Sequence, residues 1–214
     1  MSLQSGLQMT NNGTFNLIPF AQQEAGTLDK YLQQIARFDV DSGMLNFDAY
    51  CAAINVELAR SAETKNYSTL IEIKLKGITR ISDMLGRKAS IFVVRELSSR
   101  FLSLALPGAI FGRTDHKTFS VFLANESDPV SVLHTTKLLI AACERPFAWD
   151  GNIISIEATA GIAISTSLTD DAHTLMHHAA LAIRAANTGG GPGYAFFNPA
   201  DAAAAKRRHD LMSI

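Results

Sequence analysis

The sequence is poor in charge and in long apolar runs, and each shortage excludes a class of protein. Charged residues occupy 18% of the 214 positions and nearly cancel, leaving a net charge of −1. No overall field therefore draws the chain to nucleic acid or to a membrane surface. No run of 18 apolar residues is present, so we predict no segment that spans a bilayer. The N-terminal residues also lack the basic start and apolar block of a signal peptide.

Cysteine is scarce as well. Cys51 and Cys143 lie far apart and in no metal-ligand or redox spacing, so we expect two buried thiols in a reducing, cytoplasmic compartment. Hydrophobic residues, by contrast, make up 47% of the chain. A chain of this length and apolar content can bury a full core without disulfides or metals. The sequence therefore predicts one domain with flanking segments. No cofactor is expected.

Helical and strand patterns alternate along the chain. Residues 67–77 alternate apolar and charged side chains, which is typical of a strand with one buried face. Residues 109–113 and 118–124 read as a hairpin, and 153–166 and 194–197 as two further strands. In the predicted strand 153–166, Gly161 permits close backbone approach. Asn46 can cap the predicted helix 47–62. Helices are predicted at 26–38, 47–62, 78–85, 88–104, 130–144, 170–187 and 199–211. Residues 1–25 are predicted to form a loose lead-in.

This order of elements predicts an α+β fold. Helices pack over one mostly antiparallel sheet, and the centre resembles the split βαβ arrangement of ferredoxin-like folds.

Five stretches together resemble one known family. Residues 39–46 resemble the motif D-x-L-T-G-L-x-N, and residues 71–97 resemble D-x-D-x-F-K-x-x-N-D-x-x-G-H-x-x-G-D. Residues 112–119 resemble R-x-G-G-D-E-F, with Arg113 and Phe119 in place. Residues 158–163 resemble T-x-S-x-G-x-A, and residues 179–190 resemble A-D-x-A-L-Y-x-A-K-x-x-G. In order and spacing these stretches resemble the GGDEF (diguanylate cyclase-type) domain.

The resemblance implies a nucleotide-cyclase-like GGDEF fold with a ferredoxin-like βααββαβ core covered by helices. It divides the chain into a lead-in and connecting helix at 1–38, a degenerate GGDEF domain at 39–198 and a linker helix at 199–214. That last helix resembles the connector to a following EAL phosphodiesterase domain.

The family's metal-binding acids are replaced here. The two strand aspartates fall at Lys74 and Lys76, and the acids of the hairpin turn fall at Lys117 and Thr118. Magnesium requires hard oxygen ligands, usually carboxylates. Two unit charges about 4 Å apart repel by about 4 kcal/mol at an effective dielectric near 20, and magnesium carries twice a unit charge. We therefore expect no metal at this site.

The nucleotide-binding positions are changed as well. The family's base-reading Asn and Asp fall at Ser82 and Ile91, and Ile91 cannot accept the N–H groups of guanine. The remaining changed positions, two phosphate-binding lysines and two turn glycines, fall at Thr79, Asn187, Asp115 and His116. The resemblance thus implies a diguanylate cyclase-like pseudoenzyme without catalytic residues.

Two clusters of side chains allow sharper hypotheses. The candidate anion-binding residues are Lys74, Lys76, Arg113, His116 and Lys117, unless these cations merely cover a vacated cleft and stay solvated. Glu72 on the same strand face could pair with one of the lysines. The spacing of His173 and His177 can bind zinc, but a solvated helix surface is the plainer interpretation.

We therefore expect a catalytically inactive regulatory or relay domain in bacterial cyclic di-GMP signalling. One alternative is a GTP- or anion-binding sensor that controls an adjacent EAL domain, and another is an active diguanylate cyclase. The expected partners are an upstream sensor domain, a downstream EAL domain and a second copy of the chain. The basic residues at 206–208 indicate a solvated linker rather than a nucleic-acid site.

Overall fold

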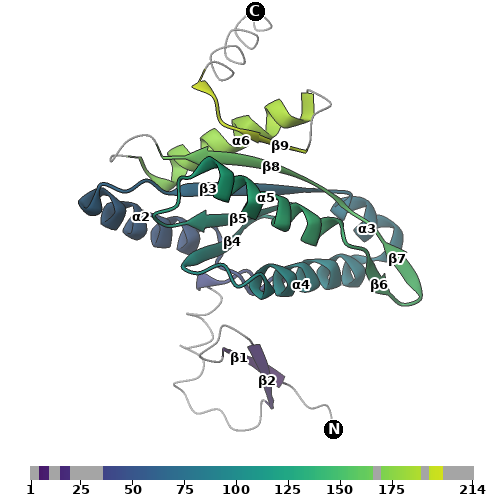
Figure 1. Ribbon diagram of the computed structural model, residues 1–214. Helices are drawn as coiled ribbons and strands as arrows, with labels where there is room; N and C mark the ends of the chain where they lie inside the picture. The colour runs from purple at the N-terminus through teal and green to yellow at the C-terminus, as the bar shows by residue number, and fades with distance from the viewer. Residues whose placement is uncertain (1–4, 10–14, 20–35, 166–169, 189–192, 200–214) are drawn as a thin grey trace, which may run out of the picture.

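A five-stranded sheet forms the centre of the computed structural model, which describes residues 5–9, 15–19, 36–165, 170–188 and 193–199 (Figure 1). The strand order is β4-β5-β3-β8-β9, and neighbouring strands are antiparallel except for β8 and β9. The strands are β3 (Thr69–Lys76), β4 (Ala109–Asp115), β5 (Thr118–Leu123), β8 (Glu157–Ile164) and β9 (Tyr194–Phe196). This confirms the predicted α+β class with a mostly antiparallel sheet.

Helices cover both faces of the sheet. Against one face lie α2 (Phe47–Thr64) and α6 (Ala172–Thr188), and against the other lie α3 (Ile78–Leu85), α4 (Arg87–Ser103) and α5 (Pro129–Glu144). The α2–α6 side buries Tyr50, Ile54, Leu70, Phe122, Ala163, Leu175 and Ala179. The larger core on the other side includes Ile71, Ile73, Val93, Leu97, Phe119, Val121, Leu139 and Ile162. The apolar periodicity of each helix thus matches the face that it buries.

Strand β3 lies at the centre of the sheet and is buried on both faces over most of its length, which corrects the prediction of one exposed face. Even Glu72, on the face predicted to be polar, is only 7% exposed. The reason is that α2 and α6 cover that face as well. Only Lys74 and Lys76, at the end of the strand, are exposed there. The strand therefore carries a buried carboxyl group, followed toward its end by two exposed ammonium groups.

Helix α6 packs closely on β8 at Gly161, as the sequence predicted. A Cβ atom built at Gly161 would overlap the carbonyl oxygen of Ala179 and lie 2.8 Å from Cγ1 of Ile183. The predicted cap of α2 is also confirmed, because Oδ1 of Asn46 accepts a hydrogen bond from the Ala49 N–H at 3.0 Å.

The predicted strand 153–166 is wrong in its extent. Two strands replace it, β7 (Asn152–Ile154) and β8, and β7 pairs with a strand that we did not predict, β6 (Phe147–Trp149). Asp150 and Gly151 join β6 to β7 with φ values of 46° and 75°. An Asp-Gly pair favours a two-residue hairpin turn of this kind, so the signal was present in the sequence.

The N-terminal region differs from the predicted loose lead-in. Strands β1 (Ser5–Met9) and β2 (Phe15–Pro19) pair in antiparallel register, from Ser5 opposite Pro19 to Met9 opposite Phe15. The sequence between them is rich in Asn, Gly and Thr, which are common in turns. The predicted helix at 26–38 falls largely on residues outside the described ranges, and the one at 199–211 almost entirely so.

Both cysteines are free and buried, as expected. Within the ranges described above, no helix combines the length and the hydropathy needed to cross a membrane.

Candidate functional site

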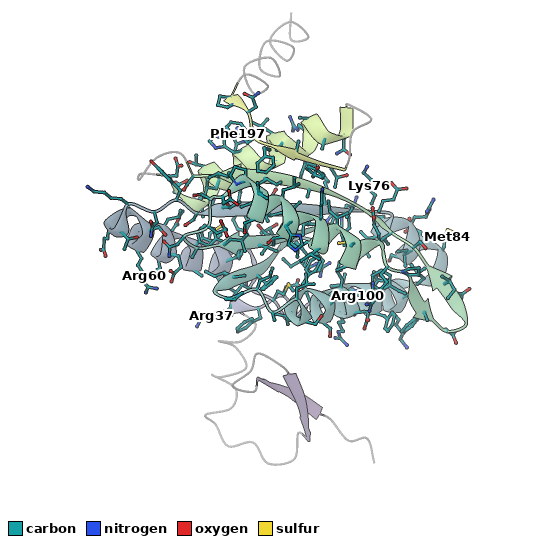
Figure 2. The ribbon with its side chains drawn as sticks, viewed as in Figure 1. Arg37, Arg60, Lys76, Met84, Arg100 and Phe197 are labelled. Atoms are coloured by element: carbon teal, nitrogen blue, oxygen red, sulfur yellow. The ribbon has the colours of Figure 1, made fainter. Side chains whose placement is uncertain are left out.

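A cleft of about 420 Å³ lies where β3 ends and α3 begins. Its wall is formed by Lys74, Leu75, Lys76, Gly77, Thr79, Arg80, Lys117, Thr159 and Asn187. The sequence predicted five of these as changed active-site positions, namely Lys74, Lys76, Thr79, Lys117 and Asn187. The fold therefore brings together residues more than one hundred positions apart. Figure 2 shows Lys76 at the end of β3 near α3.

The end of β3 fixes two of the cations. Lys74 lies opposite Thr118 of β5 and Thr159 of β8, so its side chain starts from the middle of the sheet. Gly77 ends the strand with a φ of 94° and precedes α3 without a side-chain cap. Since left-handed φ values favour glycine, Gly77 allows the sharp change of direction that places Thr79 and Arg80 beside the strand.

The turn between β4 and β5 fixes the third lysine. Oδ1 of Asp115 accepts from the Lys117 N–H at 2.6 Å, and Oδ2 accepts from the Thr118 hydroxyl at 3.0 Å. The Leu75 N–H donates to the Lys117 carbonyl oxygen at 2.7 Å, which joins the turn to β3. Asp115 therefore shapes the turn, and its carboxylate is engaged by the backbone and Thr118 instead of lining the cleft.

A side-chain pair closes the opposite wall. The Thr159 hydroxyl of β8 donates to Oδ1 of Asn187 at 3.2 Å, and the Asn187 amide donates to the Ile183 carbonyl at 3.0 Å. Asn187 thus connects the end of α6 to the sheet, although the family has a phosphate-binding lysine at the corresponding position.

The charge of the cleft is positive. Its lining includes the cations Lys74, Lys76, Arg80 and Lys117 and no carboxylate. None of the four takes part in the ion pairs formed among the described residues. Glu157 lies opposite Lys76 in the β3–β8 register and is the nearest acid by strand pairing. In the described part of the chain, no cluster of three or more His, Cys, Asp or Glu residues could hold a metal, and this includes the described helix with His173 and His177.

Arg113 does not reach the cleft, which corrects its assignment as an anion-binding residue. It is 8% exposed, and its Nη1 lies 2.9 Å from Oδ1 of Asp39 and 3.6 Å from Oδ2 of Asp41. Its Nη2 donates to the His116 carbonyl at 3.0 Å. Burial would raise the pKa of Asp39, but hydrogen bonds from Ser42 and Arg113 and the charge of Arg113 outweigh it and lower the pKa. Arg113 therefore holds segment 39–46 against the hairpin.

Replacing Asp39 by asparagine is expected to lower the free energy of unfolding by about 2 kcal/mol, because it leaves the buried Arg113 without its closest anion. The expected loss in the free energy of unfolding is smaller than for a fully buried ion pair, because the Asp39 side chain is 25% exposed. Urea unfolding followed by the fluorescence of the single tryptophan, Trp149, measures the change. The matched control is Asp41→Asn at the longer distance, which should cost less than half as much; equal losses would contradict this role of Asp39.

The other changed positions lie outside the cleft lining. Ser82 of α3 and Ile91 of α4 are half-buried, and Thr118 is buried beneath the turn. His116 is exposed in the turn and does not line the cleft, so its place in the anion-binding set stays a prediction. Arg80 and Thr159 were missed. Arg80 directly follows Thr79 in the first turn of a predicted helix, and that helical position was the available signal.

Glu72 lies deeper on the same face as Lys74 and forms no ion pair with either lysine. Burial, and to a smaller extent the charge of Asp115, raises the pKa of Glu72 to about 7, while Lys74 acts in the opposite direction. The possible Glu72–lysine pair is therefore not formed among the described residues, and burial keeps the pKa of this carboxyl group near neutrality.

The sequence and the fold match those of a known family. Residues 36–191 match the family model "Diguanylate cyclase, GGDEF domain". The structure is similar to the GGDEF domain of TpbB (YfiN) from Pseudomonas aeruginosa, with a TM-score of 0.72 and 21% identity over 79% of this chain and 99% of that chain. It is also similar to the GGDEF domain of DgcB from Caulobacter crescentus in complex with c-di-GMP, with a TM-score of 0.68 and 18% identity over 75% and 95% of the two chains.

A sequence relative is the probable diguanylate cyclase DgcE of Escherichia coli, with 23% identity over 185 residues, which are 86% of this chain and 17% of that protein. The chain spans about a fifth of the length of the curated relatives that it matches. The family model covers most of the chain, including both strands and the hairpin turn that form the cleft. The chain belongs to the GGDEF family.

Proposed function

We propose that this chain is a catalytically inactive GGDEF domain with a regulatory or relay role in cyclic di-GMP signalling. One observation carries the proposal: the cleft at the family's metal positions is lined by four cations and by no carboxylate. Lys74 occupies one position where the resemblance implies an acidic metal ligand, and Lys117 and Thr118 occupy those of the turn acids, one of which is the other ligand.

The physical reason is the mismatch between this lining and a divalent cation. Magnesium in nucleotide sites is held by carboxylates and phosphate oxygens, and no carboxylate lines the cleft. Each ammonium group at the site would also repel the ion. Phosphoryl transfer depends on metal ions and positioned cations to stabilise the charge that develops in the transition state. Without the metal, most of that stabilisation is missing.

A regulatory role would be exercised through other parts of a larger signalling protein. We propose an upstream sensor, a downstream EAL phosphodiesterase domain and a second copy of the chain as partners, in the cytoplasm. The chain spans only about a fifth of the length of its curated relatives, so those proteins carry much sequence beyond the part that it matches. This supports the proposed arrangement.

The decisive test is incubation with GTP and either magnesium or manganese, followed by chromatography for cyclic di-GMP. We expect no product above the enzyme-free blank, because the metal is not held. An active GGDEF protein in the same buffer is the positive control. Cyclic di-GMP formed in proportion to the amount of this protein would refute the proposal.

A reconstruction variant tests the electrostatic reason separately. Changing Lys74 to aspartate and Lys117 to glutamate returns acids to both positions, and manganese binding measured by electron paramagnetic resonance should rise at least about tenfold over the unchanged protein. The matched control exchanges Lys137, an exposed lysine of α5, for glutamate. Equal manganese binding by all three proteins would show that the lysines are not what excludes the metal.

A second candidate function is that of a sensor that binds an anion in the cleft and controls a neighbouring domain. The unpaired cations of the cleft favour it, since four of them converge with no partner among the described side chains.

A further inference from the structure

The cations of the cleft come from three separate elements that the fold holds together. Lys74 and Lys76 project from β3, Arg80 from the first turn of α3, and Lys117 from the turn between β4 and β5. The hydrogen bond from the Leu75 N–H to the Lys117 carbonyl fixes the turn to the strand. The four charges are therefore gathered by backbone pairing, although like charges repel.

A compensating anion would remove that repulsion. Thr79 lines the cleft as well, and its hydroxyl group adds a neutral donor to the four cationic ones. Ammonium and guanidinium groups form charge-assisted hydrogen bonds to phosphate oxygens, which are stronger than neutral ones. A volume of about 420 Å³ lies within the range of small-molecule sites.

We propose that the cleft is a metal-independent site for a polyphosphate group, in which the protein's own cations replace the divalent ion and magnesium weakens binding. The inference rests on the proposed absence of catalysis and gives the second candidate function a defined chemistry. A triphosphate carries several negative charges, and a bound magnesium ion neutralises two of them. The metal complex would therefore be attracted less strongly and would bring a dication close to Lys74 and Lys117.

The base of a nucleotide would contribute little. Ser82 and Ile91 occupy the family's base-reading positions, and neither lines the cleft. Ile91 has no side-chain acceptor for the N–H groups of guanine, so discrimination through paired hydrogen bonds is lost. Inorganic tripolyphosphate, ATP and GTP should bind with dissociation constants within about threefold of one another.

Isothermal titration calorimetry of the full chain with tripolyphosphate, ATP and GTP tests this inference, first with EDTA and then with excess magnesium. In EDTA we expect a dissociation constant below about 1 mM for each ligand. Magnesium should raise this constant at least about fivefold, and added salt should raise it further. The two ligand sources are distinguished directly, because a nucleotide site would bind GTP or ATP but not tripolyphosphate.

Variants locate the site. Lys74→Ala and Lys117→Ala should each weaken tripolyphosphate binding about tenfold, through the loss of one charge-assisted contact. Lys137→Ala, which removes an exposed cation from α5, should leave it unchanged. Circular dichroism of each variant confirms folding.

Three results would overturn the inference: no binding up to about 1 mM in EDTA, tighter binding with magnesium, or equal losses in all three variants. The proposed lack of cyclase activity is assayed separately by its product, so a failure of that proposal can be told apart from a failure of this inference.

Discussion

Replacing Gly161 by alanine is expected to lower the free energy of unfolding by about 3 kcal/mol, which is at the upper end of ordinary overpacking effects. The added methyl group would overlap the carbonyl oxygen of Ala179 and approach Ile183 Cγ1. A carbonyl in the middle of α6 cannot rotate away as a side chain can, so the whole helix must move off β8. That movement would open the core that Leu175 and Ala179 share with the sheet.

A second glycine provides the matched control. At Gly112 the three atoms nearest to the added Cβ atom all belong to the side chain of Tyr50. Gly112→Ala should therefore be rescued in part by Tyr50→Ala, which removes the ring, whereas Gly161→Ala should not be rescued by Ile183→Ala, because the backbone carbonyl remains. Double-mutant cycles from urea unfolding measure both couplings. Full rescue at Gly161 by the Ile183 change would show that the carbonyl is not the obstacle.

Replacing Glu72 by glutamine is expected to make the protein more stable at pH 8 by about 3 kcal/mol, while leaving it almost unchanged at pH 4.5. Burial raises the pKa of Glu72 from 4.5 to about 7. The folded state therefore holds the proton more tightly than the unfolded state. Its stabilising contribution is complete below pH 4.5 and is lost as the pH rises through 7, and each unit of pKa corresponds to about 1.4 kcal/mol.

Urea unfolding at intervals from pH 4.5 to 8.5 tests the direction of this pH dependence. The stability of the parent protein relative to the glutamine variant should fall with rising pH and level off above about pH 8. Taking the difference removes the contributions of groups that both proteins share, such as His178, whose pKa is lowered by burial and by His177. Glu63→Gln, an exposed change on α2, is the control for the loss of a carboxylate away from the core. A flat difference for Glu72→Gln would mean that Glu72 is charged in the folded protein throughout this range.

Local patterns predicted most of the fold. The 3.6-residue periodicity located α2 to α6 to within a few residues, and alternation located β3 and the β4–β5 hairpin. The errors arose where tertiary structure decides the outcome. Alternation in β3 indicated one exposed face, but whether a second pair of helices covers the charged face is not encoded in the strand itself. The single strand predicted at 153–166 hid the break between β7 and β8, because that break, at Ser155 and Ile156, carries no glycine or proline.

The candidate site could be predicted in part. Motif spacing placed Lys74, Lys76 and Lys117 together correctly, because the strand and turn that carry them pair directly. The same spacing failed for Arg113, since neighbours along a strand point to opposite faces and the partner of Arg113 lies 74 residues earlier, at Asp39. Motif spacing gave no signal for Arg80, because this residue falls at an unspecified position of the family motif.

The central place of β3 has a consequence for synthesis on the ribosome. One edge of β3 pairs with β5, which follows soon after it, but the other pairs with β8, whose Ala163 lies opposite Leu70. At typical translation rates of about 5–20 residues per second, that second edge stays open for roughly 5–20 seconds. An unpaired strand of this apolar character is a template for joining another nascent chain. The domain should therefore depend on chaperones most while β8 is still inside the exit tunnel.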